Sequence, residues 1–203
     1  MDQTITKQNS NNIKRIVNEY YSFFNPIINI GDKMLYSINS LYLYSLFGFI
    51  LESTIYKIKK SKRHSSIFYG PITMVYGFGI LLLLIAKKYF LDKLNIKRTQ
   101  KLIITFLTCT IILTLTEWLG GTILNKIFQI DMWNYSKKTY HLGKYICLDL
   151  ALIWGFLGTL YIYYIKDYTD KIINIIPKKL TFVFVLLNLI DTIFVLYNKI
   201  PNW

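Results

Sequence analysis

The sequence predicts an all-α protein, a polytopic bundle of about five transmembrane helices, and three observations support this. Hydrophobic residues make up 53% of the 203 residues and lie in blocks rather than at amphipathic spacing. Five of these blocks contain no lysine or arginine, and each has roughly the 20 residues that a helix needs to cross a bilayer. Lysines stand at the edges of the blocks, where their stems can lie on the apolar slab while the ammonium groups reach the headgroups.

The polar residues 1–33 are expected to form a separate N-terminal segment. Apolar side chains recur at helical spacing from Ile13 to Phe24, while the other face is polar, and Pro26 ends the pattern. This pattern predicts an amphipathic helix that lies in the membrane interface or, alternatively, packs on the protein's own loops. The segment before it lacks the basic region and cleavage pattern of a secretory signal.

The transmembrane domain is expected over residues 34–203, with spans at about 34–56, 65–86, 102–125, 145–165 and 180–198. The second span opens on a glycine-rich stretch in which Pro71 is tolerable because it falls in the first turn of a helix. The third span is followed by the longest connection, residues 126–144. In the fourth span, Gly155 is expected to allow a close helix contact.

The net charge of +13 does not indicate nucleic-acid binding, because the basic residues are dispersed over the span boundaries and form no continuous stripe. Anionic lipid headgroups are the expected counter-charge, so membrane lipids are the first expected partner. Cys109 and Cys147 both lie inside apolar windows, which argues against a disulfide framework. The sequence holds no His/Cys metal motif, and we expect neither a metal nor a cofactor.

Four of the eleven acidic residues lie inside apolar windows, one in each span except the second. Inserting a carboxylate at the centre of a transmembrane helix costs about 3 kcal/mol of free energy, so we expect these four residues to have a structural or functional role. If the helices alternate in direction, all four acids fall in the same half of the membrane. We therefore expect one polar cavity that opens to one face, lined by Glu52, Tyr69, Gly70, Pro71, Tyr76, Glu117, Trp133, Asn134, Asp149 and Asp191.

The alternative is that each acid reaches solvent or is capped separately, without a common site, and the shallow Glu52 and Asp149 fit this alternative well. Lysine and arginine are more numerous on the face opposite the acids. The positive-inside rule then predicts a cytoplasmic N-terminus and a cavity that faces outward.

The chain resembles the bacterial family described as putative ABC-transporter permeases, type IV, over roughly residues 40 to 195. The resemblance rests on Gly48 and Glu52, Phe68–Pro71, Tyr76–Gly79, Glu117–Leu119, Trp133–Ser136, Ile146–Leu148, Trp154–Gly155 and Asp191. One departure is Asn134, where the family usually has aspartate, which puts any acid/base role of that position in doubt. Gly143 also stands about one residue earlier than the family pattern. The resemblance implies a multi-pass protein of the bacterial cell membrane.

Three functions follow as hypotheses. The first is a transport subunit; because the chain has no phosphate-binding loop of the Gly-x-x-x-x-Gly-Lys-[Ser/Thr] type, it would need a separate ABC-type ATPase subunit, and its five spans suggest a homodimer. The second is a membrane-embedded enzyme that acts on a lipid or lipid-linked group, with Glu117 as general acid or base and His141 as a loop participant. The third is a non-catalytic assembly or sensing subunit. Catalytic residues remain unassigned.

Overall fold

The computed structural model describes residues 31–60 and 65–199. The chain divides into two compact units, residues 1–37 and 38–203, and the second unit holds every contact that shapes the site. The predicted amphipathic helix over Ile13–Phe24 lies outside the described residues.

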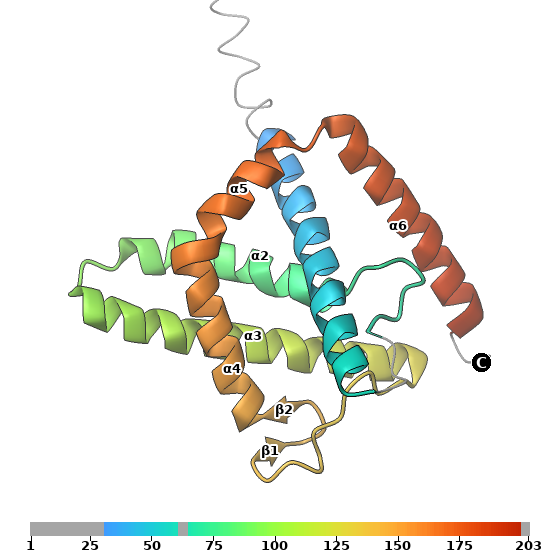
Figure 1. Ribbon diagram of the computed structural model, residues 1–203, viewed down its shortest axis with the longest axis horizontal. Coiled ribbons are helices and arrows are strands. Elements are labelled where there is room, and N and C mark those ends of the chain that lie inside the picture. The colour runs from blue at the N-terminus through green and yellow to red at the C-terminus, as the bar shows by residue number, and fades with distance from the viewer. Residues whose placement is uncertain (1–30, 61–64, 200–203) are drawn as a thin grey trace, which may run out of the picture. The chain divides into compact units, whose positions relative to one another are not determined.

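Five helical segments are long and apolar enough to cross a membrane, which confirms the predicted all-α membrane fold. They are α1 (Gly31–Ile58), α2 (Met74–Tyr89) with the short 3-10 turn Leu91–Lys93, α3 (Arg98–Phe128), α4 (Leu148–Leu160) continued by a π-helix (Tyr161–Ile165) and α5 (Lys166–Ile175), and α6 (Lys178–Lys199). Figure 1 shows α2 and α3 running beside each other, with α4 crossing α3.

Helix α2 begins at Met74, and the residues before it form an irregular segment, 65–73, called the corner below. Pro71 therefore lies before the helix, and the expectation that it occupies the first turn is wrong. Local bonds hold the backbone out of a helix: the Ile72 N–H donates to the Gly70 carbonyl (2.8 Å), and the Thr73 N–H donates to the Ser45 carbonyl of α1 (2.9 Å). A side-chain bond from Ser66 to the Ile72 carbonyl closes the turn.

Glycines let the helices approach closely at two places. A Cβ atom on Gly155 of α4 would lie 2.0 Å from the Thr110 Oγ1 of α3. A Cβ atom on Gly77 of α2 would lie 2.4 Å from the Leu41 carbonyl oxygen of α1. Such contacts suit helices in lipid, where association depends on close backbone packing. They bring α1, α2, α3 and α4 near enough for side chains from all four to meet.

The connection between α3 and α4 is an ordered loop. Its end forms a short antiparallel hairpin of β1 (His141–Leu142) and β2 (Ile146–Cys147), in which His141 pairs with Cys147. The Tyr135 N–H donates to the Lys144 carbonyl (2.7 Å), so the two arms of the loop are held together. These few strand residues leave the fold class unchanged.

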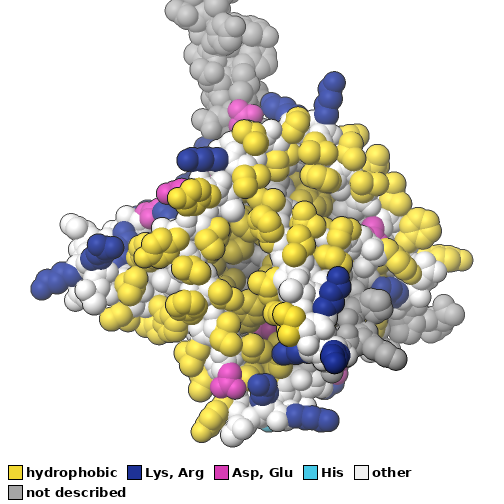
Figure 2. Space-filling view, viewed as in Figure 1, with side chains coloured by type: hydrophobic (Ala, Val, Ile, Leu, Met, Phe, Trp, Pro, Cys, Tyr) yellow, Lys and Arg dark blue, Asp and Glu magenta, His cyan; other side chains and the backbone are white. Residues whose placement is uncertain are grey.

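Helix α6 contacts the rest of the second unit through polar side chains and a small apolar cluster. Thr181 donates to the Asn39 side chain of α1 (2.6 Å), and Val195 packs with Ile67 and Phe128. Its other face is exposed: Phe182, for example, is 69% exposed. Hydrophobic side chains cover much of the visible face in Figure 2, as lipid-facing helices require.

Candidate functional site

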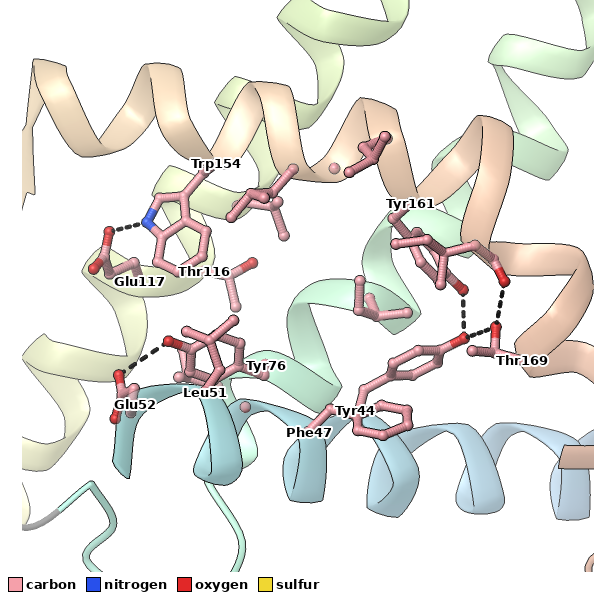
Figure 3. Close-up of a pocket in the computed structure, with 18 of the residues that line it drawn as sticks. Tyr44, Phe47, Leu51, Glu52, Tyr76, Thr116, Glu117, Trp154, Tyr161 and Thr169 are labelled. Carbon is pink, nitrogen blue, oxygen red and sulfur yellow. Dashed lines mark hydrogen bonds between the residues drawn. The ribbon is translucent and has the colours of Figure 1, made fainter. Parts of the chain in front are cut away.

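A pocket of about 320 Å³ lies among α1, α2, α3 and the α4–α5 helix, with polar groups at two ends and apolar side chains between them (Figure 3). One end holds two glutamates, and the other end holds hydroxyl groups. The lining residues are Tyr44, Phe47, Gly48, Leu51, Glu52, Val75, Tyr76, Ile80, Leu113, Thr116, Glu117, Trp133, Trp154, Leu157, Gly158, Leu160, Tyr161, Ile165 and Thr169.

Glu117 of α3 is the most enclosed carboxyl group at the acidic end, with only 9% of the residue exposed. It accepts two hydrogen bonds: one from the Tyr135 hydroxyl of the loop (2.6 Å) and one from the Trp154 indole N–H of α4 (2.8 Å). The close approach of α3 and α4 at Gly155 brings the neighbouring Trp154 within reach. Glu117 is therefore fixed by donors from two separate elements.

Glu52 of α1 is half-buried and accepts a hydrogen bond from the Tyr76 hydroxyl of α2 (3.1 Å). The Tyr76 ring packs edge-to-face against Trp154, with ring centroids 5.7 Å apart. Because Trp154 also holds Glu117, an aromatic pair links the two carboxyl groups. Among the residues that the structure describes, no lysine, arginine or histidine forms an ion pair with either glutamate.

The hydroxyl end was not expected from the sequence. The Tyr44 hydroxyl donates to Thr169 Oγ1 (2.7 Å) and lies 2.7 Å from the Tyr161 hydroxyl, and all three residues are about 95% buried. Tyr161 opens the π-helix, a form that inserts one residue and often marks functional sites. The abundance of tyrosine along the whole chain concealed this signal.

Asp191 and Asp149 lie outside this pocket, so the expectation that all four acids share one cavity is wrong for these two. Asp191 accepts the backbone N–H groups of Tyr69 (3.0 Å) and Gly70 (2.7 Å), which clamps the corner onto α6. Asp149 has a side chain 59% exposed, 3.9 Å from Lys138 Nζ. Depth along a helix can be counted in sequence, whereas the direction around the helix depends on which neighbours pack there.

A second pocket, of about 990 Å³, lies between α1, the corner and α6. The predicted site residues Tyr69, Gly70, Pro71 and Asp191 line it, so the structure separates them from Glu52, Tyr76 and Glu117. Trp133 lines the first pocket, and its indole nitrogen is one of the few buried polar side-chain atoms without a partner in the described residues. Asn134 accepts the Ser136 N–H (2.9 Å), a turn that shapes the loop.

The loop that carries Tyr135 has its own polar network. Asp131 accepts hydrogen bonds from Tyr145 (2.5 Å) and Asn125 (2.8 Å) and pairs with Lys144 (3.1 Å). The hydrogen bond from Tyr145, followed by Lys144, lowers the pKa of Asp131. Burial and the neighbouring Asp131 raise the pKa of Tyr145 to about 12.

Burial, and after it the charge of Glu117, raise the pKa of Tyr135. The Tyr135 hydroxyl therefore remains a neutral donor, well suited to hold a carboxylate. His141, expected as a loop participant, is exposed, and its Nδ1 lies 2.9 Å from the Gly143 carbonyl in the hairpin turn. Within the described ranges, no group of three His, Cys, Asp or Glu residues is placed to hold a metal ion.

Five helices that are long and apolar enough to cross a membrane define a multi-pass membrane protein, and four of these five segments line the first pocket. The chain belongs to the family described as Putative ABC-transporter type IV, whose model matches residues 40–197. That match includes every residue that lines the first pocket. The searches of curated proteins and of solved structures give no match.

Proposed function

We propose that this chain is a transport subunit of an ABC-type system in the bacterial cell membrane, and that the pocket of Glu52 and Glu117 binds the transported molecule. The observation that carries the proposal is the meeting of two carboxyl groups from different helices in one cavity. Family membership supports the transport class.

The two glutamates need a counterpart that the described protein residues do not supply. Aromatic donors satisfy part of their hydrogen-bonding capacity, but each carboxylate can accept about four hydrogen bonds. Acidic groups inside spans are costly and typically mark substrate or ion pathways. A bound cation or shared protons would offset this cost, so the pocket is suited to a positively charged or proton-donating ligand.

The loop gives the acidic end a connection to one side of the membrane. Tyr135 belongs to the segment between α3 and α4, outside the spans, yet its hydroxyl contacts the buried Glu117. Displacement of this one side chain would open the acidic end toward the loop. The contact between Tyr135 and Glu117 therefore supports a cavity that is accessible from a single face of the membrane.

Transport of this class requires ATP hydrolysis, and the sequence has no Gly-x-x-x-x-Gly-Lys-[Ser/Thr] loop. The ATPase would therefore be a separate ABC-type subunit. Five spans are few for a complete pathway, so the working unit is a homodimer with a cytoplasmic N-terminus.

The test is purification of the full chain from its native membrane in mild detergent, with ATPase activity measured after reconstitution into vesicles. We expect an ABC-type ATPase to co-purify with the chain. We expect the Glu117→Gln substitution to lower the transport-coupled ATP hydrolysis of this ATPase at least about tenfold. The matched control is Asp92→Asn, which removes an exposed carboxylate paired with Lys87 outside the pocket. The proposal fails if no ATPase associates, or if an associated ATPase responds alike to the two substitutions.

The enzyme hypothesis receives no comparable support. Thr116, which neighbours Glu117 in the sequence and also lines the pocket, donates its hydroxyl to the Ile112 carbonyl (2.8 Å) within α3. The Tyr44–Thr169 hydroxyls are likewise engaged with one another. We therefore put forward no second function.

A further inference from the structure

We propose that the ligand of the first pocket is an organic ammonium compound, with a positively charged amine or quaternary ammonium head on a compact apolar body. The inference deepens the proposed function, because it assumes that the pocket is a ligand site and names the class of molecule that fits it. Three features of the cavity favour such a ligand: its charge, its aromatic groups and its apolar middle.

Charge complementarity with the pocket sets the sign of the ligand's charge. Among the described residues that line the pocket, Glu52 and Glu117 are the only carboxyl groups, and none is a lysine, arginine or histidine. An anion would meet the like charge of both carboxylates among apolar helices, where the repulsion is screened less than in bulk water. A cation would instead be attracted to both carboxylates.

The side chains beside the carboxylates favour an ammonium group over a bare metal ion. Tyr76 and Trp154 present two rings in edge-to-face contact, and each ring also donates a hydrogen bond to one glutamate. Aromatic faces next to carboxylates are the surroundings in which proteins bind quaternary and primary ammonium groups. Within the described residues, no group of three His, Cys, Asp or Glu residues is placed to hold a metal ion here.

The middle of the pocket accounts for the apolar body. Leu51, Leu113 and Leu157 from three different helices line the space between the acidic and hydroxyl ends. A cavity of about 320 Å³ has room for on the order of ten non-hydrogen atoms, at about 30 Å³ for each water-sized group. The hydroxyls of Tyr44, Tyr161 and Thr169 bond to one another, so this end closes the pocket without requiring a charged partner.

Three small compounds with the same phenyl body test the inference: 2-phenylethylammonium, the neutral 2-phenylethanol and the anion phenylacetate. Binding to the full chain in lipid nanodiscs is measured by calorimetry and by tryptophan fluorescence, to which Trp133 and Trp154 of the pocket contribute. We expect the ammonium compound to bind at least about tenfold more tightly than the alcohol, and phenylacetate not to bind. Glu52→Gln and Glu117→Gln should each remove most of this preference, while Asp92→Asn keeps it.

Equal binding of ammonium and alcohol, tighter binding of phenylacetate, or no binding by any of the three would overturn the inference. The comparison on the unmodified chain stands even if a glutamate variant fails to fold. The result is also separable from the proposed function. An associated ATPase without ammonium binding refutes the ligand class alone, whereas ammonium binding without an ATPase refutes the transport role alone.

Discussion

Replacement of Gly77 by alanine should separate α1 from α2 and disturb the acidic end of the pocket. The added Cβ would lie 2.4 Å from the Leu41 carbonyl oxygen and 2.4 Å from the Ser45 Oγ. A carbon–oxygen contact needs about 3.3 Å, so the helices must move apart by about 1 Å. Overpacking of this kind costs about 1–3 kcal/mol, partly offset by the gain of about 0.5–1 kcal/mol from removing a helical glycine.

The expected net loss of stability is therefore roughly 0–2.5 kcal/mol, with a local consequence for Tyr76. A shift of about 1 Å would lengthen its 3.1 Å bond to Glu52 beyond hydrogen-bonding distance. Unfolding in detergent measures the stability, and near-ultraviolet circular dichroism reports the packing of Tyr76 on Trp154. Gly31→Ala is the control, because among the described residues, its own helix backbone aside, no atom lies within 4 Å of its added Cβ. Equal stability of the two variants, with an unchanged spectrum, would refute this reasoning.

Three further predictions concern single side chains. Trp154→Phe keeps a ring but removes a donor to Glu117, and should cost about 1.5–3 kcal/mol of unfolding free energy; a loss under about 0.5 kcal/mol would contradict this. Asp191→Ala should raise hydrogen exchange in the corner by at least about tenfold, since two backbone donors lose their charged acceptor; unchanged exchange would show that the clamp is dispensable. Because the pKa of Asp131 is lowered in the folded state, its contribution to stability is present above about pH 4 and is lost as the pH falls through its folded pKa. Acid should therefore increase hydrogen exchange in the loop of the unmodified chain. The same change of pH should have little effect on the loop of the Asp131→Asn variant.

The number and order of the helices follow from the sequence because the thickness of the bilayer sets the length of each apolar block. Their ends follow less well. Helix α3 extends back to Arg98 because a long cationic side chain can reach the headgroups from within a helix, and α4 continues through the π-helix into α5. The start of α2 depends on the corner, which Asp191 fixes from far along the chain.

The candidate site was partly visible in the sequence. Glu52 and Glu117 stand out as acids in apolar blocks, and both line the pocket. Trp154 belongs to a motif of the family resemblance but has no role predicted from the sequence, although its N–H donates to Glu117. Its role depends on which face of α4 meets α3, and this direction is set by tertiary packing and not by hydropathy. Thr169 is similarly placed by the π-helix, which the pattern of apolar residues does not indicate.

The π-helix at Tyr161–Ile165 determines how the hydroxyl end is aligned. Each residue of an α-helix turns the chain by about 100°, so one inserted residue rotates everything that follows it by that angle. Thr169, which accepts a hydrogen bond from Tyr44, follows the insertion, so its direction includes this rotation. Deletion of a single residue between 161 and 165 would yield a more regular helix that points Thr169 elsewhere. The extra residue of the π-helix thus sets the rotational register of α5 relative to α4. The hydroxyl end of the pocket depends on this register.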